Sequence, residues 1–215
     1  DIMLGIPHQT PKSLVDSLEF AASLGVEHIS VYMLKIEDGT PFSKMVHTLP
    51  MPDDDLTCDM YLMACERLKS LGYYQYEISN FSKEGFESKH NLKYWEGKEY
   101  AGFGCAAHSY LNSKRYSYPR SIDKYISCSD FSDIKEDVTF IDEKESKREA
   151  LIFGLRLSKG IDMSVLEGYD VAYLLKLFIK QEYCTVKDNV LSLTPKGMLV
   201  SNNIISEILL REKDI

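Results

Sequence analysis

The chain has 215 residues, of which 44% are hydrophobic and 27% charged, the composition of a globular protein with one large domain or one domain plus a small second one. Lysine and arginine total 25 against 33 aspartates and glutamates, a net charge of -8, which argues against a nucleic-acid-binding surface as the main function. No apolar run is long enough to cross a bilayer, and five scattered cysteines without a CxxC pair exclude zinc-ribbon and thioredoxin-like proteins and fit free thiols in a reducing cytoplasm.

The N-terminal residues predict a strand, a helix and a second strand. Residues 1–6 are apolar, as at the end of a buried strand, and residues 28–34 form another short apolar run. Between them, Thr10 suits an N-cap and Pro11 the first helical position, so a helix is predicted that ends before Gly25. This spacing is a βαβ unit, which implies a parallel sheet.

The next segment alternates between regular and irregular patterns. An apolar stripe predicts a helix over residues 56–71, and alternating aromatic residues predict a strand over 73–81. Residues 83–98 are predicted to be irregular. Residues 100–111 are rich in glycine and alanine, which is typical of backbone that must approach another backbone or a ligand closely.

The composition shifts after residue 127. Residues 128–147 are rich in charge and serine and are predicted to be a connecting segment. The apolar spacing then predicts helices over 149–157 and 171–179, a β-hairpin over 185–193, and one further helix that Thr194 caps. Helices followed by a hairpin and a helix resemble a winged helix. The predicted organisation is a first domain, a connecting segment and a C-terminal domain: residues 1–127, 128–147 and 148–215.

The hexapeptide HNLKYW, residues 90–95, carries the most specific chemistry. It holds the only tryptophan, and a tyrosine follows its histidine by four residues. A neutral imidazole at His90 could ligate haem iron, and the rings of Tyr94 and Trp95 could cover a large planar ligand. From the residues alone, a structural histidine hydrogen-bonded at the edge of an aromatic cluster is the alternative, and both interpretations stay open.

Four stretches in this order resemble the radical S-adenosylmethionine (SAM) enzymes of the oxygen-independent coproporphyrinogen III oxidase family, and within it the HemW-like branch of haem chaperones. They are residues 1–10, YEISNF (76–81) with HNLKYW, GFGCAAHS (102–109), and the run from LIFGLRL (151–157) to LTPKG (193–197). The resemblance implies an α/β fold: the C-terminal part of a partial radical SAM (β/α) barrel, followed by a small winged-helix-like domain. It also implies that His90 ligates haem, with Tyr94 and Trp95 shaping the pocket.

The SAM site of that family carries over in part. By resemblance, Asp1 takes the place of an aspartate that contacts SAM, and Lys35 and His108 line the same cavity. A carboxylate suits this task because it can pair with the sulfonium, the ammonium or the ribose hydroxyls. From the residues alone, the alternative is that Asp1 hydrogen-bonds a nearby loop.

The family's CxxxCxxC loop, which holds a [4Fe–4S] cluster, does not occur in this chain. None of its five cysteines can substitute by spacing. We therefore expect a C-terminal fragment of a longer protein, with haem as cofactor here and SAM and the cluster in the full-length parent only.

The resemblance implies a cytoplasmic haem chaperone that passes haem to respiratory proteins, without nucleic acid, with peripheral membrane contact and as a homodimer. No catalytic residue is assigned. The alternative is an enzyme, the oxygen-independent coproporphyrinogen III oxidase itself, and whether the chain belongs to an enzyme stays open. Without the resemblance, the sequence indicates only an α/β domain with a small-molecule pocket at its strand ends and a helical interaction domain.

Overall fold

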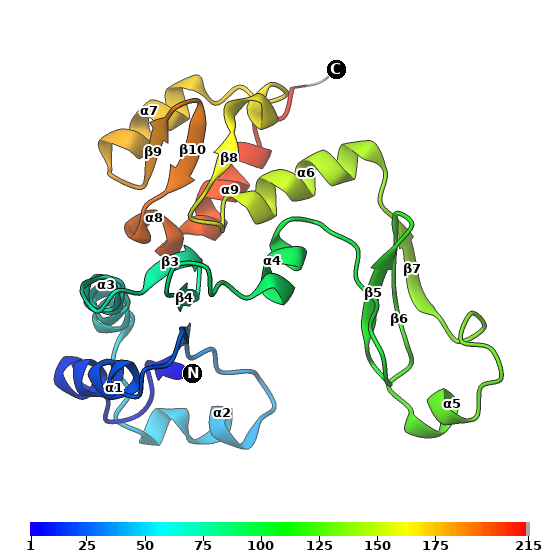
Figure 1. Cartoon of the computed structure of the whole chain (residues 1–215), viewed down its shortest axis with the longest axis horizontal. Helices are drawn as coiled ribbons and strands as arrows, with labels where there is room; N and C mark the ends of the chain where they lie inside the picture. Colours follow the sequence, from blue (N-terminus) through cyan, green and yellow to red (C-terminus); the bar gives the residue numbers. More distant parts are fainter. Residues whose placement is uncertain (214–215) are drawn as a thin grey trace.

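The computed structural model describes residues 1–213, and its N-terminal layer is a four-stranded sheet of order β1-β2-β4-β3 (Figure 1). The elements of this layer are β1 (Ile2–Leu4), α1 (Pro11–Ser23), β2 (His28–Met33), α2 (Pro41–Met45), the 3₁₀ helix η1 (Val46–Thr48), α3 (Asp54–Ser70), β3 (Tyr74–Glu77) and β4 (Asn80–Ser82). Strands β1 and β2 are parallel, which confirms the predicted βαβ unit, whereas β4 is antiparallel to both β2 and β3. The sheet is therefore mixed.

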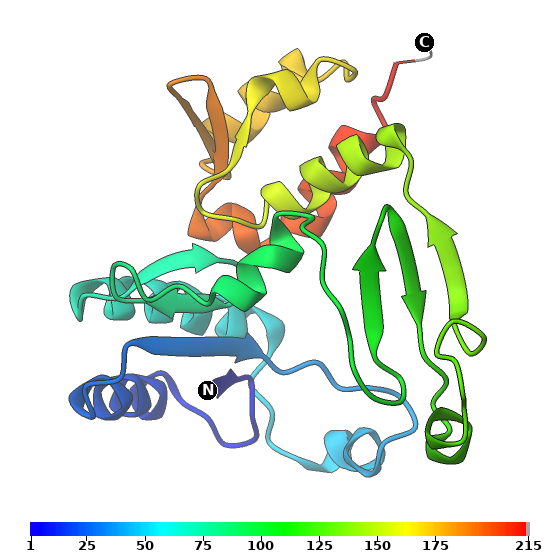
Figure 2. The same cartoon turned by 45° about the vertical axis from the view of Figure 1, so that its right-hand side comes forward.

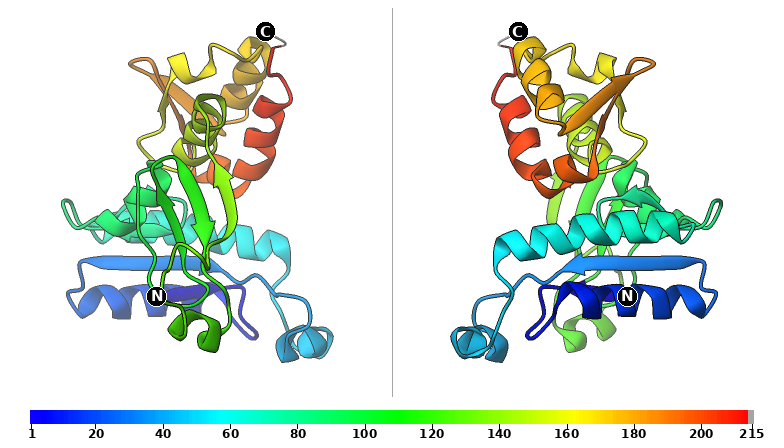
Figure 3. Two further views of the ribbon diagram at one scale, coloured as in Figure 1. Left: turned by 90° about the vertical axis from the view of Figure 1, so that its right-hand side faces the viewer. Right: turned by 90° about the vertical axis from the view of Figure 1, so that its left-hand side faces the viewer.

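The two faces of this sheet differ. Leu4 and Val31 are buried against α1 and α3, which run alongside β2 (Figure 3). Met3 and Tyr32 pair across β1 and β2 on the other face, where they are 42% and 39% exposed. Since side chains alternate along a strand, Asp1 belongs to the same face as Met3. The face opposite the helices is therefore open to solvent at these strands.

The single strand predicted over residues 73–81 is wrong, because the chain reverses at Ile78 and Ser79 to form β3 and β4. The buried carboxylate of Glu77 organises this turn: it accepts hydrogen bonds from the Ser79 backbone N–H, at 3.0 Å, and from the Asn80 side-chain amide. Burial raises the pKa of Glu77.

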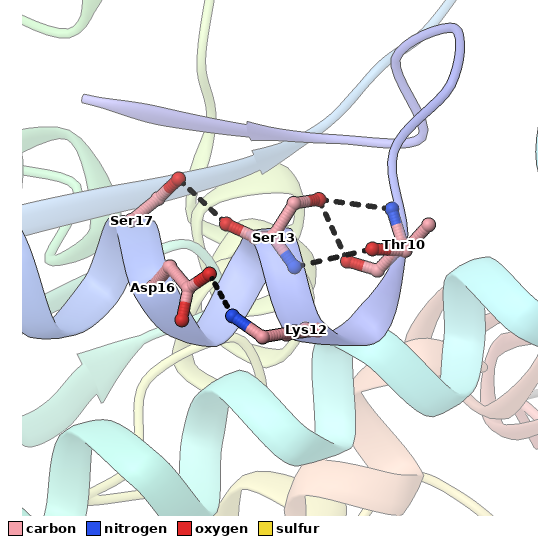
Figure 4. Close-up of polar contacts among 5 residues, drawn as sticks. All are labelled: Thr10, Lys12, Ser13, Asp16 and Ser17. Atoms are coloured by element: carbon pink, nitrogen blue, oxygen red, sulfur yellow. Dashed lines mark hydrogen bonds and ion pairs between the residues drawn. The ribbon is translucent and has the colours of Figure 1, made fainter.

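Helix α1 begins as the sequence predicts, with Thr10 as N-cap and Pro11 as first residue. Figure 4 shows the capping box: the Ser13 backbone N–H donates to Thr10 Oγ1 at 3.2 Å, and the Thr10 N–H donates to Ser13 Oγ at 2.9 Å. One turn on, the Ser17 hydroxyl donates to the Ser13 carbonyl at 2.8 Å. Two of the free N–H groups at the start of the helix thus gain partners.

Replacing Thr10 by alanine removes the hydroxyl that caps Ser13. We expect Thr10→Ala to lower the free energy of unfolding by about 1 kcal/mol, measured by urea denaturation. Ser17→Ala is the matched control, because the Ser17 hydroxyl donates to a carbonyl that the helix already uses; it should change stability by less than about 0.5 kcal/mol. Equal effects of the two substitutions would contradict the capping role.

A three-stranded antiparallel sheet of order β5-β6-β7 stands beside the N-terminal layer (Figures 1 and 2). In chain order, the elements after β4 are α4 (Lys89–Trp95), β5 (His108–Leu111), β6 (Lys114–Ser117), α5 (Ile122–Ile126) and β7 (Glu136–Phe140). One prediction is wrong here: residues 83–98 are not wholly irregular, because they contain α4. The segment predicted to connect the two domains, residues 128–147, contains β7 and the start of α6 (Glu143–Gly154). The predicted close approach within 100–111 is confirmed, since a Cβ on Gly102 would lie 2.2 Å from the His108 carbonyl oxygen.

The C-terminal part is helical with a small sheet of order β8-β10-β9. Its elements are α6 (Glu143–Gly154), β8 (Ile161–Asp162), the 3₁₀ helix η2 (Met163–Leu166), α7 (Ala172–Lys180), β9 (Cys184–Lys187), β10 (Val190–Leu193), α8 (Pro195–Leu199) and α9 (Ser201–Leu209). The predicted hairpin is confirmed as β9 and β10. The single helix predicted after Thr194 is instead two, because Val200 leaves helical geometry at φ -111 and ψ 20.

Two hydrophobic cores hold these parts, one under the N-terminal sheet and one in the C-terminal part. The first includes Leu4, Leu14, Leu18, Val31, Met60 and Leu68, and the second Leu151, Leu155, Leu191, Met198, Ile205 and Ile208. No residue of β5, β6 or β7 belongs to either core. The guanidinium of Arg115 on β6 instead binds both carboxylate oxygens of Glu149 on α6, at 2.6 and 3.0 Å.

Within residues 1–213, no helix has both the length and the apolar character needed to cross a membrane. All five cysteines are free thiols.

Candidate functional site

The histidine of the HNLKYW motif lies in helix α4, which begins after Ser88. The Ser88 hydroxyl caps the helix by accepting the Asn91 N–H at 3.3 Å. Because residues four apart share a helix face, His90 and Tyr94 lie side by side. His90 Nε2 and the Tyr94 hydroxyl are hydrogen-bonded at 3.0 Å, and the two rings meet edge-on with centroids 5.1 Å apart. Both side chains are exposed, Tyr94 to 41%.

A row of aromatic rings continues from Tyr94 toward the three-stranded sheet. The ring of Tyr100 lies 4.5 Å from that of Tyr94 in a T-shaped arrangement, and Tyr100 pairs through its backbone with Tyr110 on β5. The guanidinium of Arg115 lies 5.3 Å from the Tyr110 ring. The face of α4 that presents His90 is thus bordered on one side by aromatic surface.

Trp95 lies on a different side of the helix. Five residues correspond to about 140° of rotation from His90 around α4. The indole packs against Phe153 of α6, with ring centroids 6.3 Å apart. The next residue, Glu96, forms ion pairs with Lys98 and Lys159, which lower the pKa of its carboxyl. The structure therefore places Trp95 at the junction of α4 and α6 and not beside the His90 ring.

The other three candidates lie apart. Asp1 is exposed at the start of β1, and His108 is exposed as the first residue of β5. Lys35 follows β2 and forms an ion pair with Glu37 at 2.9 Å, which raises the pKa of the Lys35 ammonium. In the part of the chain that the structure describes, no hydrogen bond or ion pair joins any two of Asp1, Lys35 and His108.

The donor set fits haem and does not fit a cluster. Among residues 1–213, no three or more histidine, cysteine, aspartate or glutamate side chains gather to hold a metal ion. A [4Fe–4S] cluster needs several protein thiolates. Haem iron is already held by the four porphyrin nitrogens, so one exposed imidazole such as His90 suffices as its protein ligand.

Within residues 1–213, two of the cavities lie away from the candidate residues. One, of about 1050 Å³, lies between α6 and η2, with Lys147, Val165 and Tyr169 in its wall. The other, of about 570 Å³, lies between α3 and α8, with Cys65 and Met198 in its wall. No candidate residue lines either of these two cavities, and the His90 side chain is exposed on the surface of α4.

Comparisons with known proteins agree with these observations. Residues 141–200 match the HemN C-terminal domain. The chain is 32% identical to "Heme chaperone HemW" of Bacillus subtilis (strain 168) over 97% of its own length, and 30% identical to "Heme chaperone HemW" of Lactococcus lactis over 98%. In both cases it spans 58% of the relative's length.

Among solved structures, the fold is similar to that described as "Coproporphyrinogen III oxidase (HemN) from Escherichia coli is a Radical SAM enzyme", with a TM-score of 0.67 and 18% identity. The match covers 95% of this chain and 52% of that one. The structural similarity and the match of residues 141–200 together define an α/β protein that carries a HemN C-terminal domain. Nearly the whole chain is thus similar in sequence to proteins named heme chaperone HemW, and its C-terminal part matches the HemN C-terminal domain.

Proposed function

We propose that this chain is the haem-binding part of a haem chaperone and that His90 is its axial iron ligand. The observation that carries the proposal is the exposed His90 imidazole on α4, beside the aromatic rings of Tyr94 and Tyr100. Its relatives over nearly the whole chain bear the name heme chaperone. An exposed imidazole beside apolar rings provides both an iron ligand and a surface on which a porphyrin can lie.

The His90 imidazole has a ring nitrogen that is available to ligate iron. In residues 1–213, His90 Nδ1 has no hydrogen-bond partner, and Nε2 has only the Tyr94 hydroxyl. Such a bond contributes about 0.5–1.5 kcal/mol, so His90 can release Tyr94 at small cost. A buried imidazole with both nitrogens bonded to protein would have excluded ligation.

The direct test is a titration of the protein with ferric haem, followed by the Soret band and by the emission of Trp95, the only tryptophan. Trp95 lies about 7.5 Å along the helix axis from His90, so haem bound there should quench its emission. Metal-free protoporphyrin is the matched control, because it keeps the ring and lacks the iron. If both porphyrins bind with equal affinity, iron ligation plays no part and the proposal fails.

The hydrogen bond between Tyr94 and His90 gives a second prediction. Because the Tyr94 hydroxyl occupies Nε2, Tyr94→Phe should free this atom while keeping the aromatic ring. We expect ferric haem to bind about 2- to 10-fold more tightly, the range that a net hydrogen bond of about 0.5–1.5 kcal/mol allows. Weaker binding of haem to Tyr94→Phe, measured by the same Soret titration, would show that the hydroxyl helps to hold haem and does not compete with it.

For SAM, we propose Asp1 as the carboxylate that pairs with the cofactor's positive groups or ribose, with Lys35 and His108 at the edges of the same site. The support is the placement of Asp1 on the open face of the N-terminal sheet. Lys35 would exchange its pairing with Glu37 for the cofactor. Among residues 1–213, no group of side chains fits a [4Fe–4S] cluster, so no step through one is assigned to them.

The C-terminal part is proposed as a winged-helix-like domain that contacts the haem acceptor, for which we propose a respiratory haem protein. Support comes from the element order α6, β8, η2, α7, β9, β10 and from the sheet order β8-β10-β9, in which β8 pairs with the last strand. The alternative enzymatic function, oxidation of coproporphyrinogen III, would be favoured if the protein, supplied with a cluster, SAM and reductant, formed protoporphyrinogen over many turnovers.

A further inference from the structure

Helix α4 is too short to hold its own conformation. It has seven residues, whereas isolated helices shorter than about 12–15 residues are marginal in water. The direction in which His90 and Tyr94 point therefore depends on what fixes the two ends of α4. At its N-terminal end, the Ser88 backbone N–H donates a long hydrogen bond of 3.4 Å to the hydroxyl of Tyr76 on β3.

The C-terminal end of α4 is held by the C-terminal part of the chain. Trp95, the last residue of the helix, packs edge-on against Phe153 of α6. Glu96, which follows, forms an ion pair with Lys159 in the turn between α6 and β8. The C-terminal end of α4 thus makes one aromatic contact and one charged contact, both with α6 and the turn that follows it.

The backbone next to Phe153 and next to Lys159 is closely packed. Gly154, next to Phe153, lies so close to β8 that a Cβ there would approach Ile161 Cγ2 to 2.4 Å. Gly160, next to Lys159, has φ +69, and a Cβ there would lie 2.1 Å from the Leu191 carbonyl oxygen on β10. Gly154 and Gly160 therefore lie directly against the β8-β10-β9 sheet. Their close packing holds the adjacent residues Phe153 and Lys159 near the C-terminal core.

We propose that Phe153 and Lys159 are positioning residues for the haem site: they hold the C-terminal end of α4 so that His90 and Tyr94 present their open face. This inference rests on the proposed function of His90. Neither residue touches the imidazole; each acts through Trp95 or Glu96. The haem site is then shared between two parts of the fold, the ligand on α4 and its support in the C-terminal part, and a displacement of α6 changes the direction of His90.

The test compares Lys159→Glu and Phe153→Leu with matched controls in the same part of the chain. Lys187→Glu makes the same charge change on β9, and Tyr173→Leu replaces an aromatic residue on α7 that is 81% exposed. The Lys159 side chain is 62% exposed, so its reversal leaves the core intact. The measurements are the Kd for ferric haem, the emission maximum of Trp95 and the hydrogen exchange of the α4 amides.

We expect Lys159→Glu to weaken ferric haem binding about 2- to 5-fold and Phe153→Leu about 2- to 10-fold, the ranges that an exposed ion pair and an aromatic pair allow. Both should redshift Trp95 emission and speed exchange in α4, while the controls leave all three unchanged. Lys159→Arg, which keeps the charge that pairs with Glu96, should bind ferric haem as tightly as the unaltered protein.

Faster exchange in α4 without weaker haem binding would overturn the positioning role, as would weaker binding without any change in α4. If the unaltered protein binds no haem, the proposed function fails, while exchange and emission still decide whether Phe153 and Lys159 hold α4.

Discussion

His90→Ala is expected to lower the affinity for ferric haem by roughly 100-fold. The substitution removes the one imidazole that α4 presents to solvent, which is the proposed iron ligand. Loss of groups that merely orient a metal ligand commonly weakens binding 10- to 100-fold, so loss of the ligand itself belongs at the upper end of that range. The Soret maximum should also move toward that of free haem.

The control for this substitution is Lys93→Ala on the same helix. Lys93 is exposed on α4 and its side chain forms no ion pair among the described residues. Alanine favours helix, so α4 should keep its conformation in both variants. Haem binding by Lys93→Ala should match that of the unaltered protein. An unchanged Soret band and Kd in His90→Ala would remove His90 from the site.

Gly197→Ala is expected to destabilise the protein by about 3 kcal/mol, near the upper end for overpacked sites. A Cβ at this position would lie 1.8 Å from the Tyr183 carbonyl oxygen. That oxygen belongs to backbone and already accepts the Thr194 N–H at 3.0 Å, so no side-chain rotation relieves the clash. The midpoint of urea unfolding should fall, with an unchanged dependence of the free energy on urea concentration.

Gly168→Ala is the matched control for this clash. A Cβ at Gly168 meets nothing within 4 Å, and the residue needs no left-handed backbone conformation. Alanine there restricts the unfolded chain and should leave stability unchanged or raise it by up to about 1 kcal/mol. If Gly197→Ala proved as stable as Gly168→Ala, the close approach of α8 to Tyr183 would be contradicted.

The N-terminal βαβ unit could be predicted because strong local signals coincide. Thr10 and Pro11 mark the start of α1, and the buried positions Leu14 and Leu18 follow at helical spacing. By contrast, α4 could not be predicted from periodicity, because its seven residues contain no buried side chain. Its conformation comes from the Ser88 cap and from contacts with α6, which is distant in the sequence.

The reversal between β3 and β4 escaped prediction for a related reason. No glycine or proline marks Ile78 and Ser79, and the hydrogen bonds of the turn go to the buried Glu77 carboxylate. Strand β7 was hidden because all five of its residues are exposed, so it lacks the apolar alternation of a half-buried strand.

For the candidate site, the sequence predicted the residue types but not their arrangement. The contact between His90 and Tyr94 follows only once the segment is known to be helical, since spacing of four residues brings side chains together on a helix and not in a loop. Phe153 and Lys159 carried no signal of their own. Phe153 belongs to an apolar helical run, and Lys159 is one of many lysines.

The β5-β6-β7 sheet contributes no residue to either hydrophobic core, and this affects how the protein unfolds. Its ties to the C-terminal part include the paired charges of Arg115 and Glu149, which stabilise less than a buried apolar interface and weaken as salt concentration rises. Regions with few buried apolar contacts open at lower free energy than the global transition. We therefore expect this sheet to open at lower free energy than the two hydrophobic cores.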